Sequence, residues 1–304
     1  MNLLLTGAFT YAEEQFNTLS CLGYEIYFLQ KETDELPLPA NEIDAVVCNG
    51  LFLHHNIDTF VRLRFIQLTS AGLDRIPIEK IQTRNIILRN ARGVYSIPMA
   101  EWALFCVLKH YKQAGYFICS QVTRQWQKNR ELREIVGTKV AIIGAGSVGQ
   151  EVAKRFYALG ANVVGFDIRV SKISYFLDMR LIQELERCIA EFDIIIVTAP
   201  LTEETHHLLS ENILMQLKEH AVLVNIARGA IIDQEALYRT LLNRPDIHAA
   251  LDVFENEPLS IESPLWEMSN VFISPHNSFV SDGNMERMFN VIYNNLADFI
   301  GQKS

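Results

Sequence analysis

Short apolar runs alternate with longer amphipathic segments along most of the chain. In the first hundred residues, the runs typical of strands lie at residues 3–6, 25–29, 45–48, 65–68 and 86–88. Turn-forming residues such as Gly7 and Asn49-Gly50 follow them, and a segment that can form a helix lies at 12–22. Regular alternation of this kind predicts a parallel sheet covered by helices.

The same alternation continues in the second half of the chain. Strand-like runs lie at residues 140–143, 162–167, 193–198, 221–226, 249–252 and 271–274. Residues 98–111 are apolar on most sides, which is typical of a buried helix, with Pro98 suited to its first turn. Residues 284–300 read as an amphipathic helix with apolar positions four residues apart. The polar stretch 121–130 contains Trp126, which we expect to act as a packing anchor.

One strand is followed by glycines in the order Gly144, Gly146 and Gly149, and the next strand ends on Asp167. The first glycine permits a tight turn, the second lets the backbone approach a pyrophosphate, and the third lets helix and strand pack closely. The phosphates would lie on unpaired N–H groups at the helix start. Such a motif binds a dinucleotide cofactor, in which Asp167 would bind the ribose hydroxyls and repel a 2′-phosphate. We therefore predict that the protein prefers NADH to NADPH as its cofactor, although Arg169 partly offsets the repulsion. The alternative is a glycine-rich turn in some other α/β protein.

Composition narrows the class of protein. The 304 residues suggest about two domains, and the formal net charge of −9 argues against a general binder of nucleic acid or anionic membrane. The five cysteines are scattered without C-x-x-C spacing, which is typical of a reduced, cytoplasmic protein without a zinc site. The N-terminus lacks the basic region of a signal peptide, and no apolar run reaches the length of a membrane span.

Three polar residues follow successive strands of the second half. These are Arg228, Glu257 and His276. In open α/β sheets, ligands bind outside the carboxyl ends of the strands. A guanidinium can grip a carboxylate, an imidazole can give a proton, and a carboxylate beside the imidazole fixes its tautomer and favours its charged form. Each residue also has an ordinary structural explanation, as an ion-pair partner, a solvated loop or a capped turn. Together, behind the glycine motif, they predict reduction of a 2-oxo acid.

These motifs make the sequence resemble the D-isomer-specific 2-hydroxyacid dehydrogenases, the family of phosphoglycerate, D-lactate and glyoxylate/hydroxypyruvate reductases. The resemblance runs from about residue 65 to the C-terminus. The segments that carry it are Ser70-Ala-Gly-Leu-Asp74, Ala100-Glu101, Gly144 to Gly149 with Asp167, Pro200-Leu-Thr, Asn225-Ile-Ala-Arg-Gly229, Asp252-Val-Phe-Glu-Asn-Glu-Pro258 and Ser274-Pro-His276.

The resemblance implies a role for each matching residue. Arg228, Glu257 and His276 form the catalytic set. The loop Ser70-Ala71-Gly72 binds the substrate carboxylate together with Arg228, and His276 protonates the carbonyl oxygen. Asp252 orients the nicotinamide carboxamide. The cofactor is NAD, no metal is expected, and the other cofactor contacts are Ser96, Gly144, Gly146, Ser147, Val148, Gly149, Asp167, Pro200, Thr205 and Ala227.

The resemblance also implies an α/β fold of two Rossmann-like domains with parallel sheets and a cleft between them. Residues 1–97 and 276–304 form a flavodoxin-like substrate domain, and residues 98–275 form the dinucleotide-binding domain. Family members are usually homodimers, with the helix beginning at Pro98 contributing to the interface. The expected partners are a small 2-oxo acid or 2-hydroxy acid and a second copy of the chain, with no nucleic acid and no membrane.

Departures from the family pattern leave the substrate open. Asn277, Ser278 and Phe279 follow the histidine where many members have small residues, and Arg92 and Tyr95 lie on a loop that varies with substrate. Arg92 is either a second positive charge for a phosphate or distal carboxylate, or a surface residue. The remaining histidines match no catalytic motif and are expected to be structural or solvated: His54, His55, His110, His206, His207, His220 and His248.

Two rival functions remain. Related formate and phosphite dehydrogenases oxidise other small anions on this fold. Co-repressor relatives keep the fold and the triad but act as non-catalytic NAD sensors, and they would be expected to carry a disordered tail or a peptide-binding groove. We expect no such tail, since only four residues follow Ile300. An assay of NADH consumption with a panel of 2-oxo acids separates these rivals from a reductase.

Overall fold

The computed structural model describes residues 1–73 and 75–301. The chain divides into two compact units, each described by itself. Unit 1 comprises Met1–Tyr95 and the segment from Ser281 onward, and unit 2 is Ser96–Val280. Asp74, part of the motif that begins at Ser70, lies outside the described residues.

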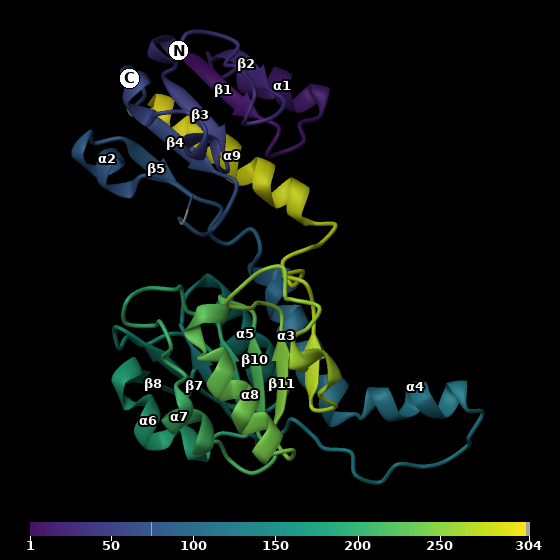
Figure 1. Ribbon diagram of the computed structural model, residues 1–304. Coiled ribbons are helices and arrows are strands. Elements are labelled where there is room, and N and C mark those ends of the chain that lie inside the picture. Colours follow the sequence, from purple (N-terminus) through teal and green to yellow (C-terminus); the bar gives the residue numbers. More distant parts are fainter. Residues whose placement is uncertain (74, 302–304) are drawn as a thin grey trace. The chain divides into compact units, whose positions relative to one another are not determined.

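Unit 1 is built on a parallel five-stranded sheet in the order β2-β1-β3-β4-β5 (Figure 1). This is the flavodoxin-like order. The helix α9 packs on the sheet through its buried apolar face, with the Phe299 ring stacked on Phe65 at 4.8 Å and the Tyr24 hydroxyl bonded to the Leu296 carbonyl. The strands are β1 (Asn2–Thr6), β2 (Glu25–Leu29), β3 (Ala45–Cys48), β4 (Phe65–Leu68) and β5 (Ile87–Arg89), and the helices are α1 (Glu13–Ser20), α2 (Ile78–Thr83) and α9 (Asn284–Gly301).

Unit 2 is built on a parallel seven-stranded sheet in the order β12-β11-β10-β9-β6-β7-β8. Counted from its own first strand, this is the 3-2-1-4-5-6 order of dinucleotide-binding folds with one strand added. The strand order reverses between the neighbouring parallel strands β6 and β9, since the strands that follow each of them lie on opposite sides of this pair. The strands are β6 (Lys139–Ile143), β7 (Asn162–Asp167), β8 (Asp178–Leu181), β9 (Ile194–Val197), β10 (Val222–Asn225), β11 (His248–Leu251) and β12 (Val271–Ile273).

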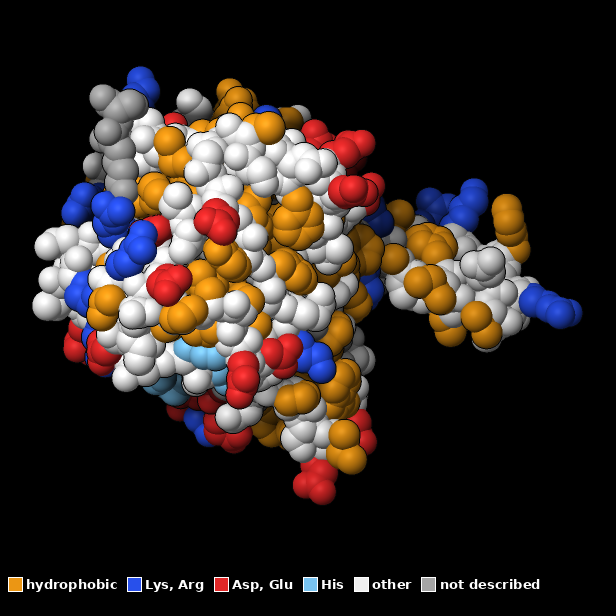
Figure 2. Space-filling view, turned by 90° about the horizontal axis from the view of Figure 1, so that it is seen from above, with side chains coloured by type: hydrophobic (Ala, Val, Ile, Leu, Met, Phe, Trp, Pro, Cys, Tyr) orange, Lys and Arg blue, Asp and Glu red, His pale blue; other side chains and the backbone are white. Residues whose placement is uncertain are grey.

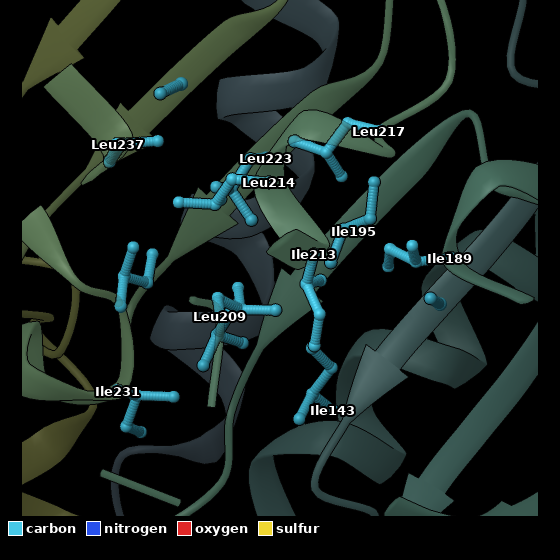
Figure 3. Packing of buried hydrophobic residues seen from close by; sticks show 14 of the residues in the cluster. Ile143, Ile189, Ile195, Leu209, Ile213, Leu214, Leu217, Leu223, Ile231 and Leu237 are labelled. Atoms are coloured by element: carbon cyan, nitrogen blue, oxygen red, sulfur yellow. The ribbon is translucent and has the colours of Figure 1, made fainter. Parts of the chain in front are cut away.

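Helices cover both faces of this sheet because successive strand residues point to opposite sides. Ile195 and Val197 of β9 join a core against α6, α7 and α8, part of which Figure 3 shows. Ile194 and Ile196 join the opposite core against α3 and α5. The helices are α3 (Ser96–Tyr111), α4 (Ala114–Val122), α5 (Ser147–Ala158), α6 (Leu185–Cys188), α7 (Glu211–Met215) and α8 (Gln234–Asn243). The prediction of an α/β fold with two parallel sheets is confirmed.

The observed unit boundaries differ slightly from those read from the sequence. Residues 96–97 and 276–280, expected in the substrate domain, fall in unit 2, and the second of these segments shows why. The reason is local hydrogen bonding. The N–H of His276 donates to the Asp252 carbonyl, and the N–H groups of Asn277 and Ser278 donate to the Asp252 carboxylate. These bonds tie the segment after β12 to the end of β11.

One part of unit 2 lies away from its sheet. After α3 the chain continues into α4 and an extended return, residues 114–132, which we call the arm. In Figures 1 and 2 it projects from the rest of the unit, with apolar and basic side chains along it. Trp126, expected to be a packing anchor, is fully exposed on the arm, so that prediction is wrong for the isolated chain. Within the described residues, we find no helix with the length and apolar character needed to cross a membrane.

Candidate functional site

The glycine motif forms a tight turn between β6 and α5. Gly144 has a φ of +96°, and its N–H donates to the Phe166 carbonyl at 2.7 Å. A Cβ there would lie 2.6 Å from the Ala199 backbone, and one on Gly149 would lie 2.0 Å from the Gly144 oxygen. A Cβ on Gly146 would meet nothing within 4 Å. Packing therefore requires the first and third glycines, while the second borders open space.

Side chains that the sequence reading missed hold this turn. The Thr198 hydroxyl, just after β9, donates to the Gly144 carbonyl at 2.6 Å, and the Gln150 amide donates to the Ala145 carbonyl at 2.9 Å. Asp167 accepts the N–H of Ala145 on one oxygen and that of Ile168 on the other, both at 2.7 Å. Each carboxylate oxygen can accept a further hydrogen bond. Asp167 thus braces the turn and keeps acceptor capacity for two ribose hydroxyls.

The described residues fit a bound dinucleotide in three respects. Ser147 begins α5 directly after the open position at Gly146, and the first N–H groups of a helix have no partner within it. Asp167 ends β7. The Ser96 and Ser278 hydroxyls, in side chains no more than 4% exposed, have no hydrogen-bond partner in the described structure. A buried hydroxyl without a partner is costly, and a polar ligand would relieve that cost.

The other expected cofactor residues lie at the carboxyl ends of β9 and β10. The Thr205 hydroxyl accepts the N–H of Thr202 and donates to the Pro200 carbonyl, both at 2.7 Å. Thr205 is therefore engaged in closing the loop after β9. Ala227 is buried between β10 and Arg228, and Val148 is half-buried on α5 against the core shared with α3.

Arg228 follows β10 in a turn that its neighbours fix. The buried Asn225 side chain accepts the N–H of Ala227 at 3.1 Å and donates to the Arg228 carbonyl at 2.9 Å. Gly229 packs so closely on the next loop that a Cβ would lie 1.9 Å from the Phe254 carbonyl carbon. The Arg228 guanidinium donates to the Ala227 carbonyl at 2.8 Å. Asn225 was not assigned a role from the sequence, although a polar residue ending a buried strand was a visible signal.

His276 and Glu257 are joined by a hydrogen bond. The imidazole Nδ1 lies 2.8 Å from Glu257 Oε2, and the other Glu257 oxygen accepts the Phe254 N–H at 3.0 Å. Both side chains are more than a third exposed, so they are open to a substrate. His276 has a φ of +50°, which non-glycine residues rarely adopt, and the Phe279 ring meets its imidazole edge-on at 5.9 Å.

Asp252 fixes the segment that carries His276. Its carboxylate, 1% exposed, accepts the hydroxyl of Ser274 and the backbone N–H groups of Asn277 and Ser278. These bonds flank the left-handed residue on both sides and offset its backbone strain. The structure thus gives Asp252 a bracing role beside the nicotinamide contact expected of it. The sequence offered no signal for this, because the partners come from a different strand.

The proposed carboxylate loop, Ser70-Ala71-Gly72, belongs to unit 1. Its carbonyls accept bonds from Ala91, from the Asn90 amide and from Ser70 itself, while none of its three N–H groups has an acceptor in the described structure. Successive N–H groups without partners are donors that an anion can bind. Arg92 lines a pocket of about 550 Å³ in the same unit, together with Leu73, Leu88, Arg89, Asn90, Val291, Asn294 and Asn295.

The structure therefore brings part of the expected site together. His276, Glu257 and Asp252 form one bonded group, and Gly144 and Asp167 are linked through Ala145. Arg228 follows β10, the neighbour of β11, in the same unit. The loop at Ser70 is part of the other unit. Among the described residues, no group of three or more His, Cys, Asp or Glu side chains is arranged to hold a metal ion.

The sequence is similar to those of known enzymes. Residues 104–278, more than half of the chain, match the family model "D-isomer specific 2-hydroxyacid dehydrogenase, NAD binding domain". A hydroxypyruvate reductase of Thermotoga maritima is 31% identical over 250 residues, which cover 81% of each chain. A D-3-phosphoglycerate dehydrogenase of Methanocaldococcus jannaschii is 32% identical over 72% of this chain, but the match spans only 42% of that protein.

A solved structure agrees with these sequence matches. A D-isomer-specific 2-hydroxyacid dehydrogenase family protein of Aeromonas salmonicida superposes with a TM-score of 0.82 at 26% identity, covering 99% of this chain and 96% of the other. The chain belongs to the D-isomer-specific 2-hydroxyacid dehydrogenase family. The predicted family, the NAD-binding domain and the oxidoreductase class are confirmed.

Proposed function

We propose that this protein reduces a small 2-oxo acid to the D-2-hydroxy acid with NADH. The observation that carries the proposal is the His276–Glu257 hydrogen bond of 2.8 Å, formed by side chains that follow different strands of the dinucleotide-binding unit. Carbonyl reduction requires a proton donor within hydrogen-bond reach of the carbonyl oxygen, and His276, held by Glu257, can supply that proton. The turn that carries Arg228 lies after the neighbouring strand.

The roles of the side chains follow from their chemistry. A bound nicotinamide supplies the hydride. An ionised carboxylate only accepts hydrogen bonds, so the His276 Nδ1 carries a hydrogen toward Glu257, and Nε2 is left to face the substrate. Charged His276 gives its Nε2 proton to the carbonyl oxygen, which completes the alcohol and leaves the ring neutral. In the oxidative direction, neutral Nε2 takes that proton back.

Substrate binding rests on charge and on N–H donors. The planar guanidinium of Arg228 suits a bidentate contact with a carboxylate and its neighbouring carbonyl oxygen. Within its own unit, the Ser70–Gly72 loop offers N–H groups to an anion, since none of them has an acceptor among the described residues. A 2-oxo acid presents both acceptors on adjacent carbons, whereas a simple ketone presents one.

We propose further that the chain forms homodimers through the arm. Side chains on it are unusually exposed for apolar residues, with Ile118 at 60%, Val122 at 77% and Trp126 at 101%. The arm also carries Arg124, Lys128 and Arg130, which complement a second copy of a chain whose net charge is −9. A reduced, cytoplasmic setting is a further proposal, supported by the five cysteines, all of which are free.

The test is an assay of NADH consumption by the purified full-length protein. The panel covers glyoxylate, pyruvate, hydroxypyruvate, and branched and aromatic 2-oxo acids, each paired with a carbonyl compound that lacks the carboxylate, such as acetone for pyruvate. We expect reduction of one or more acids, no comparable reduction of their partners, and a D-configured product. The proposal fails if no 2-oxo acid consumes NADH, or if the carboxylate-free compounds react equally well.

A further inference from the structure

A second histidine–carboxylate pair joins the loop after β9 to the loop after β11 that carries Glu257. His207 Nε2 is 2.9 Å from Glu255 Oε1, and Glu255 is two residues before Glu257 in the chain. The same oxygen accepts the N–H of Gln234 at 3.0 Å, and the Glu255 N–H donates to the Gln234 side chain at 3.2 Å. Glu255 thus connects the loops after β9, β10 and β11.

His207 is also bound to the Arg228 turn through its backbone. Its N–H donates to the Ala230 carbonyl at 2.8 Å, and its φ is +50°. Two residues further on, Leu209 N–H donates to Ile231, so the segments after β9 and β10 run side by side. A histidine rarely adopts this left-handed backbone conformation, so we attribute it at His207 to the surrounding contacts, which include the bond from its ring to Glu255.

The third connection runs through Phe254. Its N–H donates to Glu257, which holds His276, while its carbonyl group packs against Gly229, directly after Arg228. The Arg228 loop and the Glu257 loop therefore meet at two points. One is the close backbone contact at Gly229, and the other is the hydrogen-bonded group of His207, Glu255 and Gln234, which we call the clamp.

We infer that His207 is a positioning residue for the reduction. It holds Glu255, and through Glu255 it keeps Glu257 and His276 in register with Arg228. This inference rests on the proposed function for its kinetic consequence, since register matters only if Arg228 and His276 act on the same substrate. A misplacement of about 1 Å in a catalytic group can lower a rate by roughly a hundredfold.

The kinetic test compares His207→Ala with His206→Ala. His206 is the matched control, because its ring stacks on His207 at 4.0 Å and makes no carboxylate contact among the described residues. We expect His207→Ala to lower kcat for 2-oxo acid reduction by roughly ten- to a hundredfold with unchanged NADH affinity, and His206→Ala to stay near wild type. His207→Asn should recover part of the loss, since asparagine tolerates positive φ and keeps a donor.

A second readout separates positioning from simple destabilisation. His207→Ala should lower kcat per NADH-binding site, whereas a loss of folded protein lowers the activity and the number of NADH-binding sites in proportion. If His207→Ala folds poorly, Glu255→Gln serves instead, because it keeps one acceptor oxygen and the shape of the side chain while removing the charge.

A third measurement does not depend on activity. In protein with isotope-labelled histidine, the imidazole resonance of His276 is identified by its absence from His276→Gln. It should shift in His207→Ala and not in His206→Ala, even if no 2-oxo acid proves to be a substrate. A wild-type kcat in His207→Ala together with an unmoved His276 resonance would overturn the inference. If the wild-type enzyme instead reduces no 2-oxo acid of the panel, the proposed function is overturned.

Discussion

The position of Arg228 is set mainly by its neighbours. Asn225 bonds the turn on both sides, and Gly229 permits the backbone contact with Phe254. The guanidinium is therefore presented from a turn with little freedom. Binding of the substrate by Arg228 should therefore depend on the planar shape of the guanidinium as well as on its charge.

We predict that Arg228→Lys is not conservative. An ammonium is a single point charge and cannot make the paired contact with carboxylate and carbonyl. Hydrogen bonds to charged groups contribute about 1.5–3 kcal/mol, so kcat/KM for a 2-oxo acid should fall by roughly ten- to a hundredfold. Steady-state kinetics measure this, and NADH binding should persist. The control is Arg239→Lys, because Arg239 forms only exposed ion pairs, with Glu211 and Glu235, among the described residues. Near wild-type kinetics for Arg228→Lys would mean that the residue is structural.

Cofactor choice also depends on a single residue. The Asp167 carboxylate braces the glycine turn and has room for two ribose hydroxyls, so a 2′-phosphate would meet a negative charge. We predict higher kcat/KM with NADH than with NADPH, by roughly tenfold for each 1.4 kcal/mol of repulsion. Asp167→Asn should narrow the ratio while keeping the bond to Ala145. Equal kcat/KM for the two cofactors in the wild type would contradict this prediction, and so would an unchanged ratio in Asp167→Asn.

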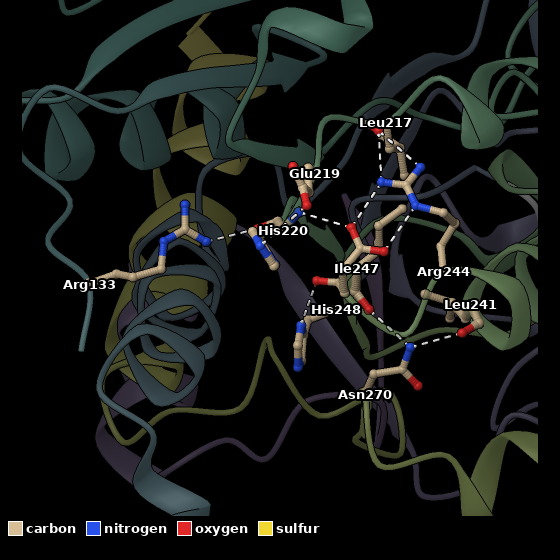
Figure 4. A network of polar contacts seen from close by, with 10 residues as sticks. Arg133, Leu217, Glu219, His220, Leu241, Arg244, Ile247, His248 and Asn270 are labelled. Atoms are coloured by element: carbon tan, nitrogen blue, oxygen red, sulfur yellow. Dashed lines mark hydrogen bonds and ion pairs between the residues drawn. The ribbon is translucent and has the colours of Figure 1, made fainter. Parts of the chain in front are cut away.

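At the scale of elements, α3 and β11 meet at a pair of half-buried histidines. The His110 and His248 rings lie 3.7 Å apart. Nearby positive groups include Lys109, His220 and Arg133, whose guanidinium donates to the His220 carbonyl (Figure 4). Asp246 faces the same region, with its carbonyl bonded to His248 and its carboxylate paired with Arg244. Burial, followed by repulsion from His248, lowers the pKa of His110 to about 4, and burial also lowers that of His248.

We predict that acid destabilises unit 2 through this pair. Between the ordinary histidine pKa of about 6.5 and the folded value of about 4, the unfolded chain binds more protons than the folded chain, so stability falls as the pH falls. Urea unfolding at pH 4–7 measures the slope. His110→Gln should flatten it while leaving stability near pH 7.5 little changed. An equal slope in wild type and His110→Gln would rule out this source of acid sensitivity.

The elements that the sequence predicted well are the buried parallel strands, because strands buried on both faces read as continuous apolar runs. The run at 193–198 and the observed β9 illustrate this. The edge strand β8, with the sequence Asp178-Met-Arg-Leu181, pairs on one side only and carries no such signal. α8 was overlooked although Asp233 caps it, accepting the Ala236 N–H at 2.9 Å. That capping residue was a readable helix start.

The candidate site was predictable only where chemistry and motif coincide. Arg228, Glu257 and His276 could be named because charged residues stand out after apolar strands. The bracing contacts could not, since Thr198, Asp252 and His207 each act through partners from other strands, and sequence spacing does not show such pairings. His207, expected to be structural or solvated, is the clearest example.

At the scale of the whole molecule, the arm leads to a prediction about assembly. Full burial of an apolar side chain contributes roughly 1.5–3 kcal/mol, and a symmetric dimer counts each contact twice. We expect sedimentation to show a dimer whose Kd rises at least about tenfold in a Val122→Ser, Trp126→Ser double variant. Ile261→Ser is the control, because Ile261 is 93% exposed outside the arm. A wild-type monomer, or a double variant that dimerises as tightly as the wild type, would refute assembly through the arm.

The central claim is that His276 gives the proton that completes reduction of a 2-oxo acid. The most direct measurement is the turnover number with saturating NADH and the best acid of the panel, in wild type and in His276→Ala. The loss of one positioned acid–base group lowers turnover by about 10²–10⁴-fold, so a decrease of that size is predicted, with NADH affinity unchanged. A His276→Ala enzyme that keeps most of the wild-type turnover would contradict the claim.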